Sequence, residues 1–137
     1  TPEALKRTLL AAKSIAYLDP AGGGASGVHF AKVLDRLGIA DEMKPKTILH
    51  ANARAGGVLV ASGDAEIGVN VMQELIPLPG IDLVGPLPAD LQNTVVYAAA
   101  IMTSAKDAAA SKVLVDFLRT PEAAAVIKAK GMEPVNP

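Results

Sequence analysis

Several chemistries are excluded by what the sequence lacks. It contains no cysteine, so disulfides, thiolate nucleophiles and cysteine-bound metals are absent. There is no tryptophan and only 3% of the residues are aromatic, which leaves little for nucleic acid bases to stack on. The 13 basic and 14 acidic residues form no long block of one sign, so we expect no nucleic acid partner. No apolar run reaches the roughly 18 to 20 residues of a transmembrane helix.

The residues that are present indicate a layered α/β fold. Half of the 137 residues are hydrophobic, which is enough for the core of one domain. Apolar runs typical of buried strands occur at residues 14–19, 46–51 and 66–72, and helical patterns separate them at residues 25–37 and 54–63. Parallel strands require crossover connections, which are usually helical. This order therefore predicts a mostly parallel sheet flanked by helices in three layers.

Further elements are expected on both sides of this alternating region. A first helix is predicted at residues 1–13, where a threonine cap precedes a proline. Two more strands are predicted at residues 81–88 and 93–102. The chain then changes character, with two alanine-rich helices expected at residues 106–119 and 120–131. The second of these opens with Thr-Pro-Glu and closes at a glycine.

The glycine-rich stretch "DPAGGGASG", residues 19–27, lies between a predicted strand and a predicted helix. It formally matches the G-x-G-x-x-G pattern of dinucleotide sites, but the acidic residue expected about 20 positions later is missing from residues 49–51. No lysine follows the glycines, which excludes a P-loop. Ser26 lacks the second glycine of a nucleophile elbow, because Val28 stands there. A nucleotide-dependent enzyme and a serine hydrolase are therefore disfavoured.

The start of the helix at residues 25–37 suits an anion instead. The first turn of a helix has N–H groups without helical partners, and the peptide dipoles add partial positive charge there. Gly24 and Gly27 allow the main chain to approach a ligand closely. The Ser26 hydroxyl can either cap the helix or donate to an oxyanion, and the sequence leaves these two roles open.

Three stretches carry a resemblance to a known family. "SGDAEIGV" and "RTPEAAAVIKAKGM" are its most specific motifs, and "DPAGGGASG" supports them. The chain resembles the substrate-binding proteins of bacterial ABC importers, in particular the molybdate-binding protein-like family with the type II periplasmic fold. The resemblance covers most of residues 13–134. It implies two α/β lobes joined by a hinge, with the ligand held in the cleft by helix N-termini from both lobes.

The resemblance also implies a domain organisation. Residues 1–93 would form the second, ligand-binding lobe, and residues 94–137 would recross the hinge and place two helices on a first lobe whose N-terminal portion is absent. We therefore expect an incomplete bilobal fold, a fragment of a longer protein. Its C-terminal helices would expose apolar faces and favour self-association or domain swapping. The residues of these faces are Val113, Leu114, Phe117, Leu118, Val126 and Ile127.

Positions in the ligand site follow from the same resemblance. Ala25, Ser26 and Gly27, directly after Gly24, fall where the family presents backbone amides to the anion. Ala53, before the helix at residues 54–63, falls on a second contact. These positions imply that the main chain supplies much of the binding.

At the third family contact the sequence departs from the family. A tyrosine is expected just after the third strand, and Val71 stands there with Asn70 beside it. The departure points away from molybdate and tungstate, toward another oxyanion or a small polar organic ligand. Asn70 can donate through its amide or act as a structural turn residue, and both roles remain open. Arg54 is a secondary candidate for a carboxylate or phosphate, because at a helix start it is usually solvated.

The expected function is therefore binding rather than catalysis. The resemblance implies an extracytoplasmic, periplasmic component of an ABC importer that captures a small anionic solute and delivers it to the membrane permease. We expect no cofactor and no metal. The alternative is the effector-sensing domain of a LysR-type transcription regulator, which has the same bilobal fold. Because the opposing lobe would complete the site, the chain alone is expected to bind anions with millimolar affinity or weaker.

Overall fold

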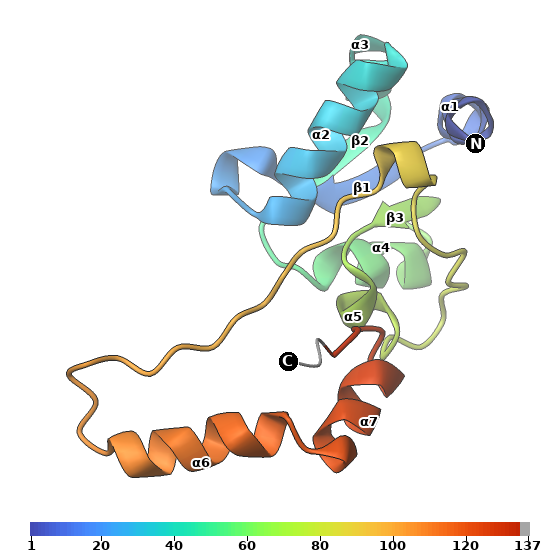
Figure 1. Cartoon of the computed structure of the whole chain (residues 1–137). Helices are drawn as coiled ribbons and strands as arrows, with labels where there is room; N and C mark the ends of the chain where they lie inside the picture. Colours follow the sequence, from blue (N-terminus) through green and yellow to red (C-terminus); the bar gives the residue numbers. More distant parts are fainter. Residues whose placement is uncertain (135–137) are drawn as a thin grey trace. The chain divides into compact units, whose positions relative to one another are not determined.

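The computed structural model describes residues 1–134 and divides into two compact units (Figure 1). The first unit ends at Thr94 and the second begins at Val95. The helices and strands of the first unit are α1 (Pro2–Ala11), β1 (Ile15–Leu18), α2 (Ala25–Leu37), α3 (Ala40–Met43), β2 (Thr47–His50), α4 (Ala55–Ser62), β3 (Ile67–Val69) and α5 (Met72–Leu75). Short 3-10 turns are η1 (Pro20–Gly22), η2 (Lys44–Lys46) and η3 (Ala89–Leu91). The second unit contains α6 (Ala108–Leu118) and α7 (Pro121–Ala129).

The sheet of the first unit is parallel, with the strand order β2-β1-β3. Ile15 in the central strand lies opposite Thr47 on one side and Ile67 on the other. The chain passes from β1 through α2 to β2, and then crosses back over β1 through α4 to β3. Because parallel crossovers are right-handed, the two opposite moves place α2 and α4 on opposite faces of the sheet (Figure 1). The predicted α/β architecture is confirmed.

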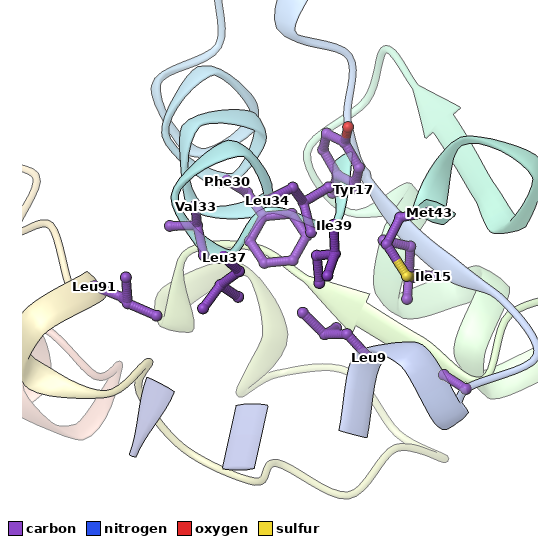
Figure 2. Packing of buried hydrophobic residues seen from close by; sticks show 11 residues of the cluster. Leu9, Ile15, Tyr17, Phe30, Val33, Leu34, Leu37, Ile39, Met43 and Leu91 are labelled. Atoms are coloured by element: carbon purple, nitrogen blue, oxygen red, sulfur yellow. The ribbon is translucent and has the colours of Figure 1, made fainter. Parts of the chain in front are cut away.

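The main hydrophobic core lies between the sheet, α1, α2 and α3 (Figure 2). Ile15 and Tyr17 of β1 belong to this core. The rings of Tyr17 and Phe30 pack edge to face, with their centroids 5.1 Å apart. Burial, and then the charges of Asp19 and Asp35, raise the pKa of the Tyr17 hydroxyl above its usual value. The remaining buried members are Leu9, Ala12, Val33, Leu34, Leu37, Ile39, Met43 and Leu91.

The opposite face of the sheet is covered by α4, which packs through glycines. A Cβ atom at Gly68 in β3 would lie 3.0 Å from the carbonyl oxygen of Gly56. A Cβ atom at Gly56 would in turn lie 2.7 Å from His50 Nε2. Glycine lowers helix propensity, so the two glycines of α4 weaken the helix locally. They are explained by this close approach of helix and sheet.

Helix ends follow the capping residues in the sequence. The Thr1 hydroxyl accepts a hydrogen bond from the Ala4 N–H, and the Thr120 hydroxyl accepts one from the Ala123 N–H. Gly131 follows α7 with a positive φ of 79°, which favours glycine. The predicted start of α1 and the predicted cap and closing glycine of α7 are confirmed, whereas α1 ends at Ala11, short of the predicted residue 13. Among residues 1–134, no helix combines the length and the apolar character that crossing a membrane requires.

Two of the predicted strands are wrong. Residues 81–88 and 93–102 contain no strand, and the sheet has three strands in the described part of the chain. Pro86 and Pro88 have no N–H to give to a ladder. Residues 95–102 lie in the second unit. The described part of that unit, residues 95–134, contains no strand with which they could pair. The strand predicted at residues 66–72 is also shorter, because β3 ends at Val69.

Candidate functional site

The proposed ligand residues all follow the strands at one edge of the sheet. Gly24–Gly27 come after β1, Ala53 and Arg54 after β2, and Asn70 and Val71 after β3. Because the strands are parallel, their carboxyl ends share this edge. The connections after the neighbouring strands β1 and β2 run in opposite directions along the sheet, and open α/β sheets bind ligands at such a reversal. The topology thus favours a ligand site at this edge.

The side chain of Asn70 joins the segments that follow all three strands. Its Oδ1 atom accepts hydrogen bonds from Ser26 Oγ at 3.0 Å and from the Val71 N–H at 2.8 Å. Its Nδ2 atom donates to the carbonyl oxygen of Ala53. We call these four residues the Asn70 network. The network brings Ser26, Ala53 and Val71 within reach of one side chain, so four of the eight proposed site residues lie together.

The start of α2 retains main-chain donors. Gly24 is the N-cap, with φ −65° and ψ 126°, and no side chain caps the helix. Val28 is the first residue of the helix whose N–H has a partner, the Gly24 carbonyl oxygen. Within residues 1–134 the N–H groups of Ala25, Ser26 and Gly27 have no hydrogen-bond acceptor. The suggestion that Ser26 caps the helix is wrong, because it lies one residue inside the first turn.

Gly27 has a packing role at this helix start. It is buried, and a Cβ atom there would lie 2.0 Å from the main-chain oxygen of Leu18, the last residue of β1. A Cβ atom at Gly24 would meet the Leu18 side chain at the same distance, but a leucine side chain can move. Gly27 therefore allows the first turn of α2 to rest directly on the end of the central strand, which fixes the position of the main-chain donors.

Arg54 has a partner within the protein. Its Nε atom lies 3.3 Å from Glu74 Oε2, and its side chain is 66% exposed. Its own N–H binds Asn52 Oδ1 at 3.0 Å. Exposed pairs of this kind contribute only about 0 to 1 kcal/mol, so the pair does not by itself fix the guanidinium. Arg54 is outside the Asn70 network and remains the secondary candidate.

The two histidines of the chain lie in different environments. His29 Nε2 lies 2.7 Å from the carbonyl oxygen of Leu91, so this nitrogen carries the proton and the pair ties α2 to η3. His50 ends β2, and both of its ring nitrogens are buried without a hydrogen-bond partner among the described residues. No cluster of three or more histidine, aspartate or glutamate side chains suited to a metal occurs within residues 1–134.

Sequence reasoning missed the connections made by Asn70. It offered Asn70 as either a ligand contact or a turn residue, whereas the amide group bonds to three other residues. Ser26 is 44 residues from Asn70 in the sequence, and no local pattern links positions so far apart. The signal that was present is the position of Asn70 directly after β3, which neighbours the central strand β1 whose following segment contains Ser26.

Known proteins resemble the chain over nearly its whole length. A family model described as "Bacterial extracellular solute-binding protein" matches residues 1–133. The aconitate isomerase of a Pseudomonas species is 33% identical over 134 residues, covering 97% of this chain and 49% of the relative. The molybdate-binding protein ModA of Azotobacter vinelandii is 34% identical over 131 residues, covering 93% and 50%. ModA of Escherichia coli K12 is 27% identical over 106 residues, covering 77% and 41%.

These matches confirm the resemblance to molybdate-binding proteins that the sequence motifs indicated. The chain spans about half the length of the curated relatives that it matches. Most of the named relatives are binding proteins, and one is named as an enzyme. With a family model that matches 133 of its 137 residues, the chain belongs to the bacterial extracellular solute-binding proteins.

Proposed function

We propose that the chain forms one ligand-binding lobe of a periplasmic solute-binding protein and holds a small anionic solute at the start of α2. The observation that carries this proposal is the set of unpaired N–H groups on Ala25, Ser26 and Gly27, at the sheet edge where the topology favours a ligand. In this function the solute would be passed to the membrane permease of an ABC importer. The family match favours this role over the effector-sensing domain of a LysR-type regulator.

The proposed ligand is a small organic anion with carboxylate groups. Main-chain N–H groups recognise acceptor oxygens and negative charge, which carboxylates and inorganic oxyanions both supply. Val71 stands where the resemblance implies a tyrosine contact, which favours a ligand other than molybdate. The relative named for aconitate, a tricarboxylate, is 33% identical over 97% of the chain. We therefore propose a carboxylate ligand, with Ala53 and Asn70 at the border of its site.

The same relative raises a second candidate, an isomerase acting on an unsaturated carboxylate. Moving a double bond requires a group that takes and returns a proton. The Asn70 network contains only neutral groups, so it supplies no side chain that takes and returns a proton in this way. This arrangement supports binding without catalysis as the proposed function.

The substitution Ala25→Pro tests the main-chain donors. Proline removes one N–H and is tolerated at the first position of a helix, and the Gly24 ψ of 126° already suits a residue before proline. We expect the unaltered chain to bind citrate with a dissociation constant in the millimolar range, and Ala25→Pro to weaken binding about tenfold, the value of one charge-assisted hydrogen bond. Amide chemical shifts of the isotope-labelled chain, followed during citrate titration, measure both constants.

Ala89→Pro is the matched control for this test. Ala89 is also exposed, begins η3, and follows a residue with ψ 141°, so proline is equally acceptable there. Citrate affinity should be unchanged in this variant. Equal affinities for citrate in all three proteins would contradict a ligand site at the start of α2. Spectra recorded with aconitate in place of citrate should show no conversion of its vinyl proton signal, and conversion would favour the isomerase.

Self-association is proposed for the chain on its own. Five of the six apolar residues named from the sequence are exposed on α6 and α7, with exposed fractions from 43% to 68%. Exposed apolar patches seek partners. We expect light scattering at high micromolar concentration to give a mass above that of the monomer, and Phe117→Ser to shift it toward the monomer. Val84→Ser, which removes an exposed apolar side chain from the first unit, should leave the mass unchanged.

A further inference from the structure

The orientation of the Asn70 amide is fixed by its neighbours. The Val71 main-chain nitrogen can only donate, so the atom that faces it must be the acceptor Oδ1. The Ala53 carbonyl oxygen can only accept, so the atom that faces it must be the donor Nδ2. If the two amide atoms exchanged places, Nδ2 would face the Val71 N–H and Oδ1 would face the Ala53 carbonyl oxygen. A donor would then face a donor, and an acceptor would face an acceptor. Asn70 therefore presents a defined acceptor to the third member of its network, Ser26.

This orientation determines where the Ser26 hydroxyl proton lies. Ser26 Oγ is 3.0 Å from Asn70 Oδ1, and Oδ1 has no proton to give, so the serine must donate. A hydroxyl has one proton and two lone pairs. Because the Ser26 hydroxyl donates its proton in the hydrogen bond to Asn70, only its lone pairs are left for a ligand, and these can only accept. The helix start therefore combines main-chain donors at Ala25, Ser26 and Gly27 with one side-chain acceptor.

We propose that Asn70 is a positioning residue that fixes Ser26 as an acceptor, and that the anion bound here consequently carries a hydroxyl group beside a carboxylate. This inference rests on the proposed function. In the bound state, carboxylate oxygens accept from the main-chain N–H groups and the ligand hydroxyl donates to Ser26 Oγ. An anion without a hydroxyl leaves that acceptor unpaired, or requires Ser26 to leave Asn70. The ligand class is a hydroxycarboxylate.

Citrate and tricarballylate test the inference, because they differ by one hydroxyl. At about pH 8 the carboxyl groups of both are ionised, so their charges match. In amide chemical-shift titrations of the labelled chain, we expect citrate to bind about fivefold more tightly than tricarballylate, the value of one hydrogen bond. Ser26→Ala should abolish this preference by weakening citrate binding alone. Equal affinities of the unaltered chain for the two anions would overturn the inference.

Asn70→Ala separates positioning from simple contact. Without Oδ1 the Ser26 hydroxyl is free to donate, so the affinity for tricarballylate should approach that for citrate. A parallel loss of affinity for both anions would show that Asn70 acts only by holding the fold or by direct contact, and would overturn the positioning role. Ser26→Thr retains the hydroxyl and should keep the preference for citrate.

A measurement without ligand distinguishes failure of this inference from failure of the proposed function. The Asn70 side-chain amide should show one slowly exchanging proton, bound to Ala53, and its resonances should shift in Ser26→Ala. A rapidly exchanging amide that Ser26→Ala does not affect would overturn the positioning role, even where citrate binds. A protected amide combined with no shift of any residue on addition of either anion would overturn the proposed function, and the hydroxycarboxylate with it.

Discussion

Gly27→Ala is expected to lower the free energy of unfolding by about 3 kcal/mol, the upper end of the cost of overpacking. The added methyl carbon would lie 2.0 Å from the main-chain oxygen of Leu18. That oxygen belongs to the central strand, which is paired on both sides and cannot retreat as a side chain would. The start of α2 must therefore move away from β1. Urea unfolding followed by circular dichroism measures the loss.

Gly22→Ala is the matched control for this substitution. A Cβ atom at Gly22 would meet nothing within 4 Å, and its φ is not in the left-handed region. Its unfolding free energy should stay within about 0.5 kcal/mol of that of the unaltered chain. If both variants lost the same stability, the cost would come from the flexibility of the glycine stretch, and the contact between Gly27 and Leu18 would not be its cause.

Phe30→Ala should destabilise the first unit by about 4 kcal/mol. The Phe30 side chain is 1% exposed and packs against Tyr17 in the cluster shown in Figure 2. Truncation removes the transfer free energy of a whole ring and leaves a cavity that the surrounding α2, β1 and α3 side chains can only partly fill. Such a loss is a large share of the 5 to 15 kcal/mol, roughly, by which domains are stable. Urea unfolding of the variant measures it.

The other phenylalanine of the chain supplies the control. Phe117 on α6 is 56% exposed, so Phe117→Ala deletes the same atoms without opening a buried cavity. Its effect on the unfolding of the first unit should be within about 0.5 kcal/mol of zero. Similar losses in the two variants would mean that the cluster around Phe30 does not form the core.

The sequence predicted the alternating strands and helices of residues 14–72 well because the signals there are local. Apolar runs predicted strands at residues 14–19 and 46–51, and the structure has β1 and β2 within these ranges. The strands predicted at residues 81–88 and 93–102 failed for a different reason. An apolar, β-branched run indicates a preference for burial or extension, but a strand also needs a neighbour with free N–H and C=O groups. No sequence window contains that information.

The site was predictable in outline and not in its bonding. Residues after β1, β2 and β3 could be grouped because parallel strands end at a common edge. The bonds of Asn70 depend on which side chains meet across that edge, with partners 17 and 44 residues away. The sequence also left open whether Ser26 caps the helix or contacts a ligand. The residue that becomes the N-cap depends on the path of the chain through Gly24, which the residue types alone do not give.

The reliance on main-chain donors affects how this site would look in a mutational survey. An alanine scan leaves Ala25 and Ala53 untouched, and at Gly27 it would report a loss of stability that has its origin in packing against Leu18. Within the Asn70 network, Ser26 and Asn70 are the residues whose polar side chains such a scan would remove. Where related lobes differ in ligand preference, we therefore expect the differences at the residues that bond to the serine hydroxyl. The peptide groups that bind the negative charge should stay the same.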